Sequence, residues 1–359
     1  MLYHLSSFLQ QYWGPFRLLS SHVLLLGGGT FFAAMLIAVF LPKLWDKLPR
    51  DRGKVICKDL GGMQSAGKPT GAGFFVTLLT LPVLIVFVPL SVGDMLALLG
   101  MYAAMLFGYL DDKAEIPWGE LKKGLLDAAC ALFIAFAIAI DHGTSIWFPF
   151  VKAVWEVPFW LYVPSAAFLL WFTMNATNCS DGVDGLAGSL TEITLIMLAV
   201  MLYVVFGYQP VANYFLIPAN PDGARWAILL MTVAGGFGGY LWFNAEPSKI
   251  LMGDAGSRFL GILVGAAVLI TGNPFLIFAM SPIVLVNGGG GLAKLVLLRT
   301  AKKLRMDIGE DSAIRKVRFP LHDHCKKNLG WSNAQVLMRF VLLQIVIMPI
   351  LLLILVKVR

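Results

Sequence analysis

The stretch "VLLLGGGTFFAAMLIAVFL", Val23–Leu41, decides the fold class of this chain. It carries no charged side chain, and its length is close to the roughly 20 apolar residues that an α-helix needs to cross a bilayer. It is apolar on every side, whereas the strands of a membrane barrel alternate apolar and polar residues. The stretch therefore predicts a membrane-spanning helix.

Runs of this kind recur along the whole chain. Of its 359 residues, 58% are hydrophobic and 14% are charged, and the mean hydropathy of +0.78 is far above that of a soluble domain. We expect an all-α integral membrane protein, a single polytopic domain over residues 1–359 with ten transmembrane helices. The ten apolar runs are Val23–Leu41, Phe74–Leu90, Met95–Leu110, Leu125–Ile140, Pro158–Met174, Leu186–Phe206, Trp226–Phe243, Phe259–Ile270, Phe275–Leu298 and Val336–Val356.

Two other classes of segment are not indicated. The first run lacks a basic flank and a small-residue cleavage site, so it is expected to be a retained helix and not a removable signal peptide. The four cysteines show no CxxC spacing, which argues against a zinc site or a disulfide framework.

The distribution of basic residues predicts the orientation. The polar segments on one side of the membrane hold 20 of the 28 Lys and Arg residues. By the positive-inside rule this side is cytoplasmic, which places both termini outside. The net charge of +7 is thereby explained as an orientation signal, and it indicates no nucleic-acid partner. The segments counted are 43–70, 111–124, 175–184, 244–257 and 299–334.

Most of the acidic motifs fall on the same predicted cytoplasmic face. Carboxylates beside glycines at helix starts suit a Mg²⁺–phosphate complex, because Mg²⁺ takes one or two protein carboxylates together with waters and phosphate oxygens. Each motif alone is equally well explained by helix capping and glycine turns, and the convergence of five acids favours a site. The acids are Asp111 and Asp112 in "GYLDDK", Asp181 and Asp184 in "NCSDGVDGLAG", and Asp254 in "LMGDAGS".

This pattern predicts chemistry at the membrane surface. Carboxylates and basic residues without a Walker loop suggest phosphoryl transfer between a soluble donor and a lipid. A transporter is the alternative from another class, and the run "NGGGG", Asn287–Gly291, would then be a broken helix. Transporters place functional charges near the midplane, whereas Glu192 and Lys294, the charges that come nearest to it, lie closer to the cytoplasmic end.

Several motifs together carry a resemblance to a known family. The chain resembles the polyprenyl-phosphate N-acetylhexosamine-1-phosphate transferases over nearly its whole length, and among them most closely the branch that uses a muramoyl-pentapeptide donor. The matching stretches are "KPTGAG" (Lys68–Gly73), "GYLDDK" (Gly108–Lys113), "NATNCSDGVDGLAG" (Asn175–Gly188), "LWFNAEPSKILMGDAGS" (Leu241–Ser257), "PLHDH" with "LGW" (Pro320–Trp331) and the terminal "KVR".

The resemblance implies a reaction and its partners. UDP-N-acetylmuramoyl-pentapeptide and undecaprenyl phosphate would give lipid I and UMP, with Mg²⁺, at the bacterial cytoplasmic membrane. A homodimer is also implied. The alternative is a relative that uses another UDP-N-acetylhexosamine, which "KPTGAG" and the "CKDLGG" at Cys57–Gly62 leave open.

The resemblance also implies a role for individual residues. Asp254 would coordinate Mg²⁺, and Asp111 and Asp112 would handle the lipid phosphate and its proton. The nucleotide site would be lined by Asn178, Asp181 and Asp184, and further substrate positions are matched by Thr70 and Asn244. Lys68 is the candidate substitute for a basic residue that the family has a little upstream, near Ser65. His322 and His324 would contact the diphosphate or the sugar, because histidine is a poor ligand for a hard cation such as Mg²⁺.

The chain departs from the family pattern at several positions. "KPTGAG" stands where the family usually has Thr-Pro-Thr-Met-Gly-Gly, Leu251 stands where an aromatic residue is expected, and Asp323 replaces the middle one of three histidines. "NGGGG" stands where the family has larger side chains. Asp323 either weakens phosphate binding or orients a neighbouring histidine.

Overall fold

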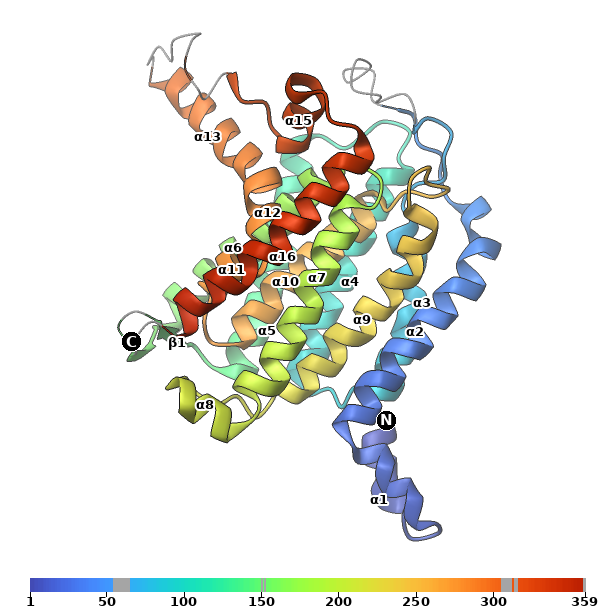
Figure 1. Ribbon diagram of the computed structural model, residues 1–359, viewed down its shortest axis with the longest axis vertical. Coiled ribbons are helices and arrows are strands. Elements are labelled where there is room, and N and C mark those ends of the chain that lie inside the picture. Colours follow the sequence, from blue (N-terminus) through green and yellow to red (C-terminus); the bar gives the residue numbers. More distant parts are fainter. Residues whose placement is uncertain (54–64, 150, 152, 305–311, 313–315, 358–359) are drawn as a thin grey trace.

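The computed structural model describes residues 1–53, 65–149, 151, 153–304, 312 and 316–357. The "CKDLGG" segment and the last two residues of "KVR" lie outside these described residues. The described chain is a bundle of long helices (Figure 1).

The predicted apolar runs correspond to the long helices. Within the described residues, nine helices are long and apolar enough to cross a membrane, which agrees with an all-α membrane protein. The second run forms α3, an apolar helix of only 16 residues, so ten crossings and the side of the termini stay predictions. The helices are α2 (His22–Leu44), α3 (Ala72–Phe87), α4 (Val92–Lys113), α5 (Glu120–His142), α6 (Phe159–Ser180), α7 (Leu186–Val200) continued by η4 (Met201–Phe206), α9 (Gly223–Asn244), α10 (Gly253–Ile270), α13 (Gly290–Lys303) and α16 (Asn333–Lys357).

Shorter elements connect these helices. The strands β1 (Ser145–Phe148) and β2 (Ala153–Glu156) form an antiparallel hairpin in which Ser145 lies opposite Glu156. The remaining short elements are α1 (Leu2–Leu9), η1 (Gly14–Ser20), η2 (Trp45–Lys47), α8 (Gln209–Phe215), α11 (Leu276–Met280), α12 (Pro282–Val284), η5 (Leu285–Gly289) and α15 (Leu321–Leu329).

Helix α10 is the centre of the bundle. Almost all of its residues are buried, and it packs against α3, α4 and α6. Small residues permit this close contact: a Cβ atom on Gly73 of α3 would collide with the backbone of Gly256. The first turn of α10, which begins at Gly253, is therefore held in the middle of one end of the bundle.

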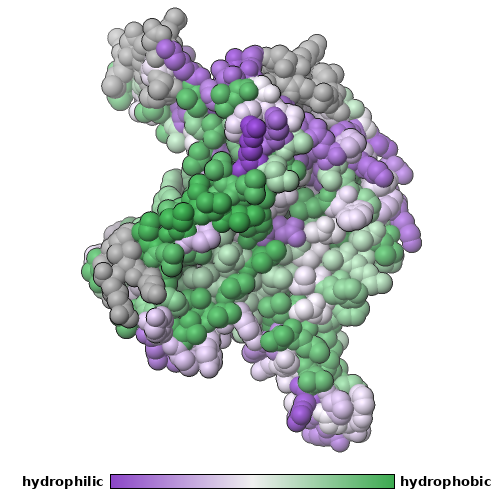
Figure 2. All heavy atoms as spheres, viewed as in Figure 1, coloured by the Kyte–Doolittle hydropathy of each residue, from purple (hydrophilic) through white to green (hydrophobic). Residues whose placement is uncertain are grey.

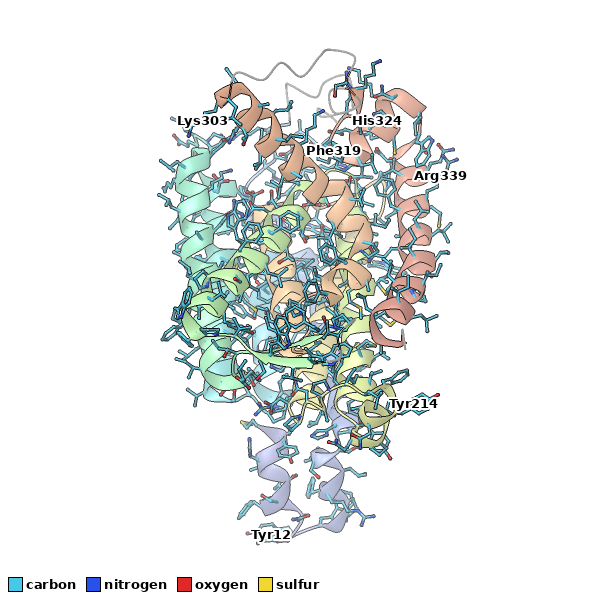
Figure 3. The ribbon with its side chains drawn as sticks, turned by 90° about the vertical axis from the view of Figure 1, so that its left-hand side faces the viewer. Tyr12, Tyr214, Lys303, Phe319, His324 and Arg339 are labelled. Atoms are coloured by element: carbon cyan, nitrogen blue, oxygen red, sulfur yellow. The ribbon has the colours of Figure 1, made fainter. Side chains whose placement is uncertain are left out.

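The two ends of the bundle differ in character. Figure 1 places α13 and α15 at one end, here called the α15 end, and the β1 hairpin, α8 and α1 at the other, here called the β1 end. Figure 2 shows polar atoms gathered at the α15 end and apolar atoms over α16 and α7 below it. Figure 3 shows Lys303 and His324 at the α15 end, and Tyr12 and Tyr214 at the β1 end.

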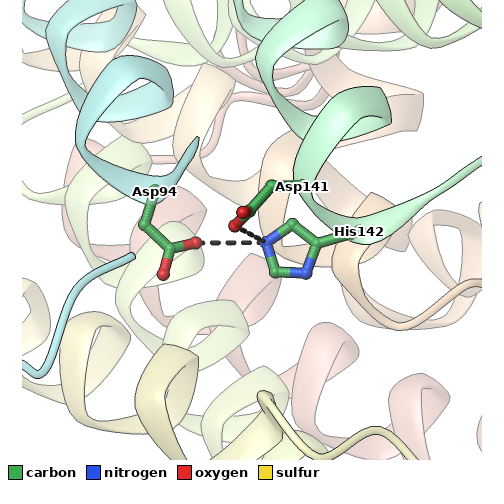
Figure 4. A group of neighbouring side chains, drawn as sticks. All are labelled: Asp94, Asp141 and His142. Carbon is green, nitrogen blue, oxygen red and sulfur yellow. Dashed lines mark hydrogen bonds and ion pairs between the residues drawn. The ribbon is translucent and has the colours of Figure 1, made fainter. Parts of the chain in front are cut away.

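A buried polar network joins α4, α5 and α9 at the β1 end (Figure 4). His142 Nε2 lies 3.1 Å from Asp94 Oδ1 and 3.3 Å from Asp141 Oδ2, and its Nδ1 lies 3.3 Å from Asp222 Oδ2. Arg225 approaches Asp94 at 3.6 Å, and the indole N–H of Trp226 donates to Asp94 at 2.9 Å. These contacts neutralise carboxylates at the helix ends and hold the three helices in register.

Candidate functional site

Two of the predicted aspartates meet at the start of α10. Asp112, near the end of α4, accepts hydrogen bonds from the backbone N–H of Asp254 at 3.2 Å and of Ala255 at 3.4 Å. A carboxylate at this position interacts favourably with the positive end of the helix dipole. Gly253 has a φ of +70°, and a side chain there would collide with the Asp112 carboxylate. The "GYLDDK" and "GDAGS" motifs are therefore parts of one junction.

Asp111 lies beside this junction and is paired with α5. One of its carboxylate oxygens accepts the Trp118 N–H at 2.8 Å, and the other forms an ion pair with Lys123. The Lys123 ammonium also lies 3.8 Å from Asp254. Lys123 thus stands between two of the predicted site carboxylates, although the sequence reasoning did not single it out.

A second basic residue reaches the junction from inside the bundle. Arg258, one turn after Asp254 on α10, donates to Asp254 Oδ2 at 3.2 Å and pairs with Asp127 of α5. Asn178 of α6 donates to the Ser257 hydroxyl at 3.0 Å and hydrogen-bonds with Asp254. Sequence reasoning had selected Asn178 but missed Arg258 and Asp127.

The segment "KPTGAG" runs beside the segment that leads into α10. Backbone hydrogen bonds join Leu251 N–H to Pro69 C=O at 2.8 Å and Ala72 N–H to Leu251 C=O at 3.0 Å. Leu251, where the family pattern calls for an aromatic residue, therefore joins the two segments through its backbone. Thr70 is fixed by its own N–H, which donates to the Pro49 carbonyl at 2.9 Å.

Lys68 connects the "KPTGAG" segment to the "DGVDG" loop through side-chain contacts. Its ammonium donates to the Ser248 hydroxyl at 2.9 Å and lies 3.5 Å from Asp184 Oδ2, and the Ser248 N–H donates to the same carboxylate at 3.1 Å. Lys68 and Asp184 are thus neighbours, as expected for residues of one site. Asp181 lies in the same loop, just after α6 ends at Ser180.

Asn244 supports this loop from behind. Its buried side-chain oxygen accepts the Gly185 N–H at 2.8 Å, and its amide group donates to the Ile250 carbonyl at 2.7 Å. Both hydrogen bonds are made within the protein, so Asn244 stabilises the conformation of this loop.

The two predicted histidines lie on α15, a short polar helix between the apolar runs. The backbone N–H of the buried His322 donates to Asn287 Oδ1 at 2.9 Å. The His322 ring lies so close to Gly182 that a Cβ atom there would collide with it. His324 instead accepts the Arg318 N–H at 3.3 Å. Residues two apart on a helix point in different directions, and only His322 is seen to lie against the "DGVDG" loop.

Asn287 belongs to the "NGGGG" run, which does form an irregular helix. The ninth apolar run is divided into α11, α12, the π-helix η5 and α13. Such π-type turns are rare and often occur at functional sites. Here the irregular turn directs Asn287 toward His322 and so joins α15 to the membrane-spanning part.

Cys325 is the cysteine of α15. Burial raises the pKa of the Cys325 thiol on α15, which keeps it protonated and a poor metal ligand. Among the described residues, the three-residue group with metal-ligand spacing is that of Asp94, Asp141 and His142. It lies at the β1 end and already contacts Arg225 and Trp226.

The junction at α10 has the composition of a site for a hard cation. Its four aspartates, 111, 112, 127 and 254, outnumber the two basic side chains that pair with them, Lys123 and Arg258. The Asp254 side chain is 28% exposed, against 6% for Asp111 and 2% for Asp127. Oxygen ligands with an excess of acidic groups suit Mg²⁺, and Asp254 is more exposed than Asp111 and Asp127 and so better placed to reach it.

Comparisons with known proteins agree on one enzyme group. Residues 95–272 match glycosyl transferase family 4. A phospho-N-acetylmuramoyl-pentapeptide-transferase of Treponema pallidum is 43% identical over 343 residues, which cover 94% of this chain and 91% of the relative. A protein of the same name from Borreliella burgdorferi is 28% identical, and the match covers 90% of this chain and 93% of the relative. Another from Borrelia hermsii is 27% identical, and the match covers 87% of this chain and 89% of the relative.

The matched regions contain all the motifs that meet at the α15 end. A relative at 43% identity over nearly the full length of both chains shares its fold and its family. The chain therefore belongs to the phospho-N-acetylmuramoyl-pentapeptide-transferase family.

Proposed function

We propose that the protein transfers phospho-N-acetylmuramoyl-pentapeptide from its UDP-linked donor to undecaprenyl phosphate, forming lipid I and UMP. One diphosphate bond forms between the lipid phosphate and the sugar phosphate while the bond to UMP breaks. Besides family membership, the observation that carries the proposal is the meeting of Asp112 and Asp254 at the start of α10, next to the Lys68–Asp184 pair. Phosphoryl transfer needs groups that position two phosphates and balance their charge, and this junction offers both.

The residues around the junction divide into two groups by position. Lys123 stands beside Asp111 and Asp254 with its side chain 27% exposed, where it can neutralise a phosphate oxygen. Lys68, Ser248 and Asp184 form a second polar group that suits the nucleotide and sugar of the donor. The lipid phosphate has its second pKa at about 6, so it is mostly dianionic at cytosolic pH and needs little help from a base. Positioning and charge neutralisation therefore contribute more than proton transfer.

Mg²⁺ is proposed as the cofactor, with Asp254 as its first protein ligand. Bound there, it would neutralise the diphosphate oxygens of the donor while the bond to UMP breaks. Asp112 is already engaged with two backbone N–H groups, and its part is to fix the start of α10 and thus the place of Asp254.

We further propose that the α15 end faces the cytoplasm of a bacterial inner membrane and that both termini lie outside. The excess of Lys and Arg in the segments at this end supports this orientation. UDP-linked sugars are soluble and charged, so the site for the donor belongs on the side where the donor is made. A homodimer is a further proposal that rests on the family resemblance alone.

The proposal is tested by incubating the purified protein with Mg²⁺, undecaprenyl phosphate and one of two donors. We expect UMP release with UDP-N-acetylmuramoyl-pentapeptide and much less with UDP-N-acetylglucosamine. Release only from the second donor would instead establish the alternative hexosamine-phosphate transferase. Release from neither, in protein that is monodisperse, would reject both activities.

A further inference from the structure

Arg258 is a buried cation that touches two carboxylates from different helices. Its side chain is 6% exposed and stands between Asp127 of α5, which is 2% exposed, and Asp254. One terminal nitrogen of the guanidinium pairs with Asp127 and the other donates to Asp254 Oδ2 at 3.2 Å. The buried Nε has no hydrogen-bond partner among the described residues.

The arrangement does more than balance charge. A buried arginine needs one carboxylate for neutrality, and Asp127 already supplies it within the bundle. Asp127 is itself held by hydrogen bonding with Asn175 of α6. Because the guanidinium is a rigid planar fork, fixing one nitrogen on Asp127 directs the other to a set place. That place is Oδ2 of Asp254.

We propose that Arg258 is a positioning residue that, anchored by Asp127, orients the Asp254 carboxylate for the cation. Asp254 also hydrogen-bonds with the neutral Asn178, but Lys123 lies 3.8 Å from Oδ2, beyond hydrogen-bonding distance, so Arg258 is the cation that holds this oxygen. Asp254 is the most exposed carboxylate of the ion-paired group, so it depends most on such support. This inference rests on the proposed function, in which Asp254 binds Mg²⁺.

The test must separate orientation from charge. Replacing Arg258 alone removes a positive charge, which strengthens cation binding, and also leaves Asp127 buried without a partner, which destabilises the fold. The double variant Asp127→Leu with Arg258→Met removes one charge of each sign. The net charge of the site is unchanged, and a hydrophobic pair of similar volume is tolerated where a buried ion pair stood.

Cation binding is measured directly with Mn²⁺ as the probe, by electron paramagnetic resonance on purified protein without substrates. We expect the double variant to bind Mn²⁺ about 10- to 100-fold more weakly than the wild type, the range for loss of a group that supports a metal ligand. In turnover assays the Mg²⁺ concentration for half-maximal rate should rise by a similar factor, and the KM for the nucleotide donor should stay unchanged. An unaltered Mn²⁺ affinity in the double variant would overturn the inference.

Two further variants complete the experiment. Arg258→Lys keeps the charge but lacks the fork, so it should bind Mn²⁺ more weakly than the wild type even if the double variant does not fold; wild-type affinity would count against the inference. Asp254→Asn tests the underlying assignment. If this variant binds Mn²⁺ normally, the metal assignment in the proposed function is wrong. If it loses Mn²⁺ while the double variant does not, only the role of Arg258 is wrong.

Discussion

Asp254 carries the strongest prediction at the scale of single residues. Asp254→Asn should lower kcat by about 10²-fold or more, because a neutral amide replaces the carboxylate that we propose as the Mg²⁺ ligand. The fold should be retained, since Asp112 bonds to the backbone N–H of residue 254 and not to its side chain. UMP release over a range of Mg²⁺ concentrations measures the effect.

The matched control for this variant is Asp46→Asn. Asp46 is 77% exposed and, in the described part of the chain, pairs with Arg50, another surface residue, so its loss should change neither kcat nor the Mg²⁺ requirement. Wild-type activity in Asp254→Asn would remove this residue from the site.

Lys68 should act on donor binding. Lys68→Ala is expected to raise the KM for the UDP-linked donor about 10-fold with a smaller change in kcat, because a charge-assisted contact to the donor is lost. Lys249→Ala is the control, since Lys249 follows Ser248 in the chain but is exposed. Equal KM values for the two variants would mean that Lys68 is only a surface charge of the loop.

The sequence identified most of the residues at the α10 junction, but not the charged residues that form ion pairs there. Asp112, Asp254 and Asn178 stand in recognisable motifs. Lys123, Asp127 and Arg258 lie in or beside apolar runs, and nothing local shows that they face one another. The feature that could have revealed these three residues is their charge, because an ionisable residue in a membrane-spanning segment is costly unless it is paired.

At the scale of elements, the positions of the helices were predictable and their ends were not. The apolar runs found α2 to α7, α9, α10 and α16, because a bilayer demands that length and composition. Helix α10 begins at Gly253, six residues before the predicted Phe259, since its first turn is polar and only partly buried. Helix α15 was missed because it is short and polar, with a positive-φ Gly330 at its end.

The docking of α15 should depend on Asn287. Asn287→Ala leaves the buried N–H of His322 without its acceptor, which costs about 1–3 kcal/mol and should loosen α15 from η5. We expect faster amide hydrogen exchange across residues 321–329 and a drop in kcat of about 10-fold.

The control for α15 is Asn333→Ala at the start of α16. Its side chain donates to Glu246 at 3.0 Å in an exposed contact, so its loss should leave exchange in α15 unchanged. Unchanged exchange in Asn287→Ala would show that α15 is held by its apolar contacts, such as that of Cys325, and not by this hydrogen bond.

At the scale of the whole molecule, polarity is arranged along the bundle axis. The site residues gather at the α15 end, whereas the His142 network holds α4, α5 and α9 together at the β1 end. The same long helices carry both groups: α4 has Asp94 at its start and Asp112 near its end. Fixing the helices at the β1 end therefore limits movement of the carboxylates at the other.

This polarity makes the orientation in the membrane testable. Tyr12 and Lys303 are exposed and lie at opposite ends of the molecule (Figure 3). In a variant with its four native cysteines changed to alanine, Tyr12→Cys should react with a membrane-impermeant maleimide added to spheroplasts. Lys303→Cys should react only after the membrane is opened, because the basic α15 end is retained in the cytoplasm.

UMP release by each variant checks that the fold is intact. The reverse labelling pattern would place the donor site outside the cell, away from its soluble nucleotide substrate, and would contradict the proposed function along with the orientation.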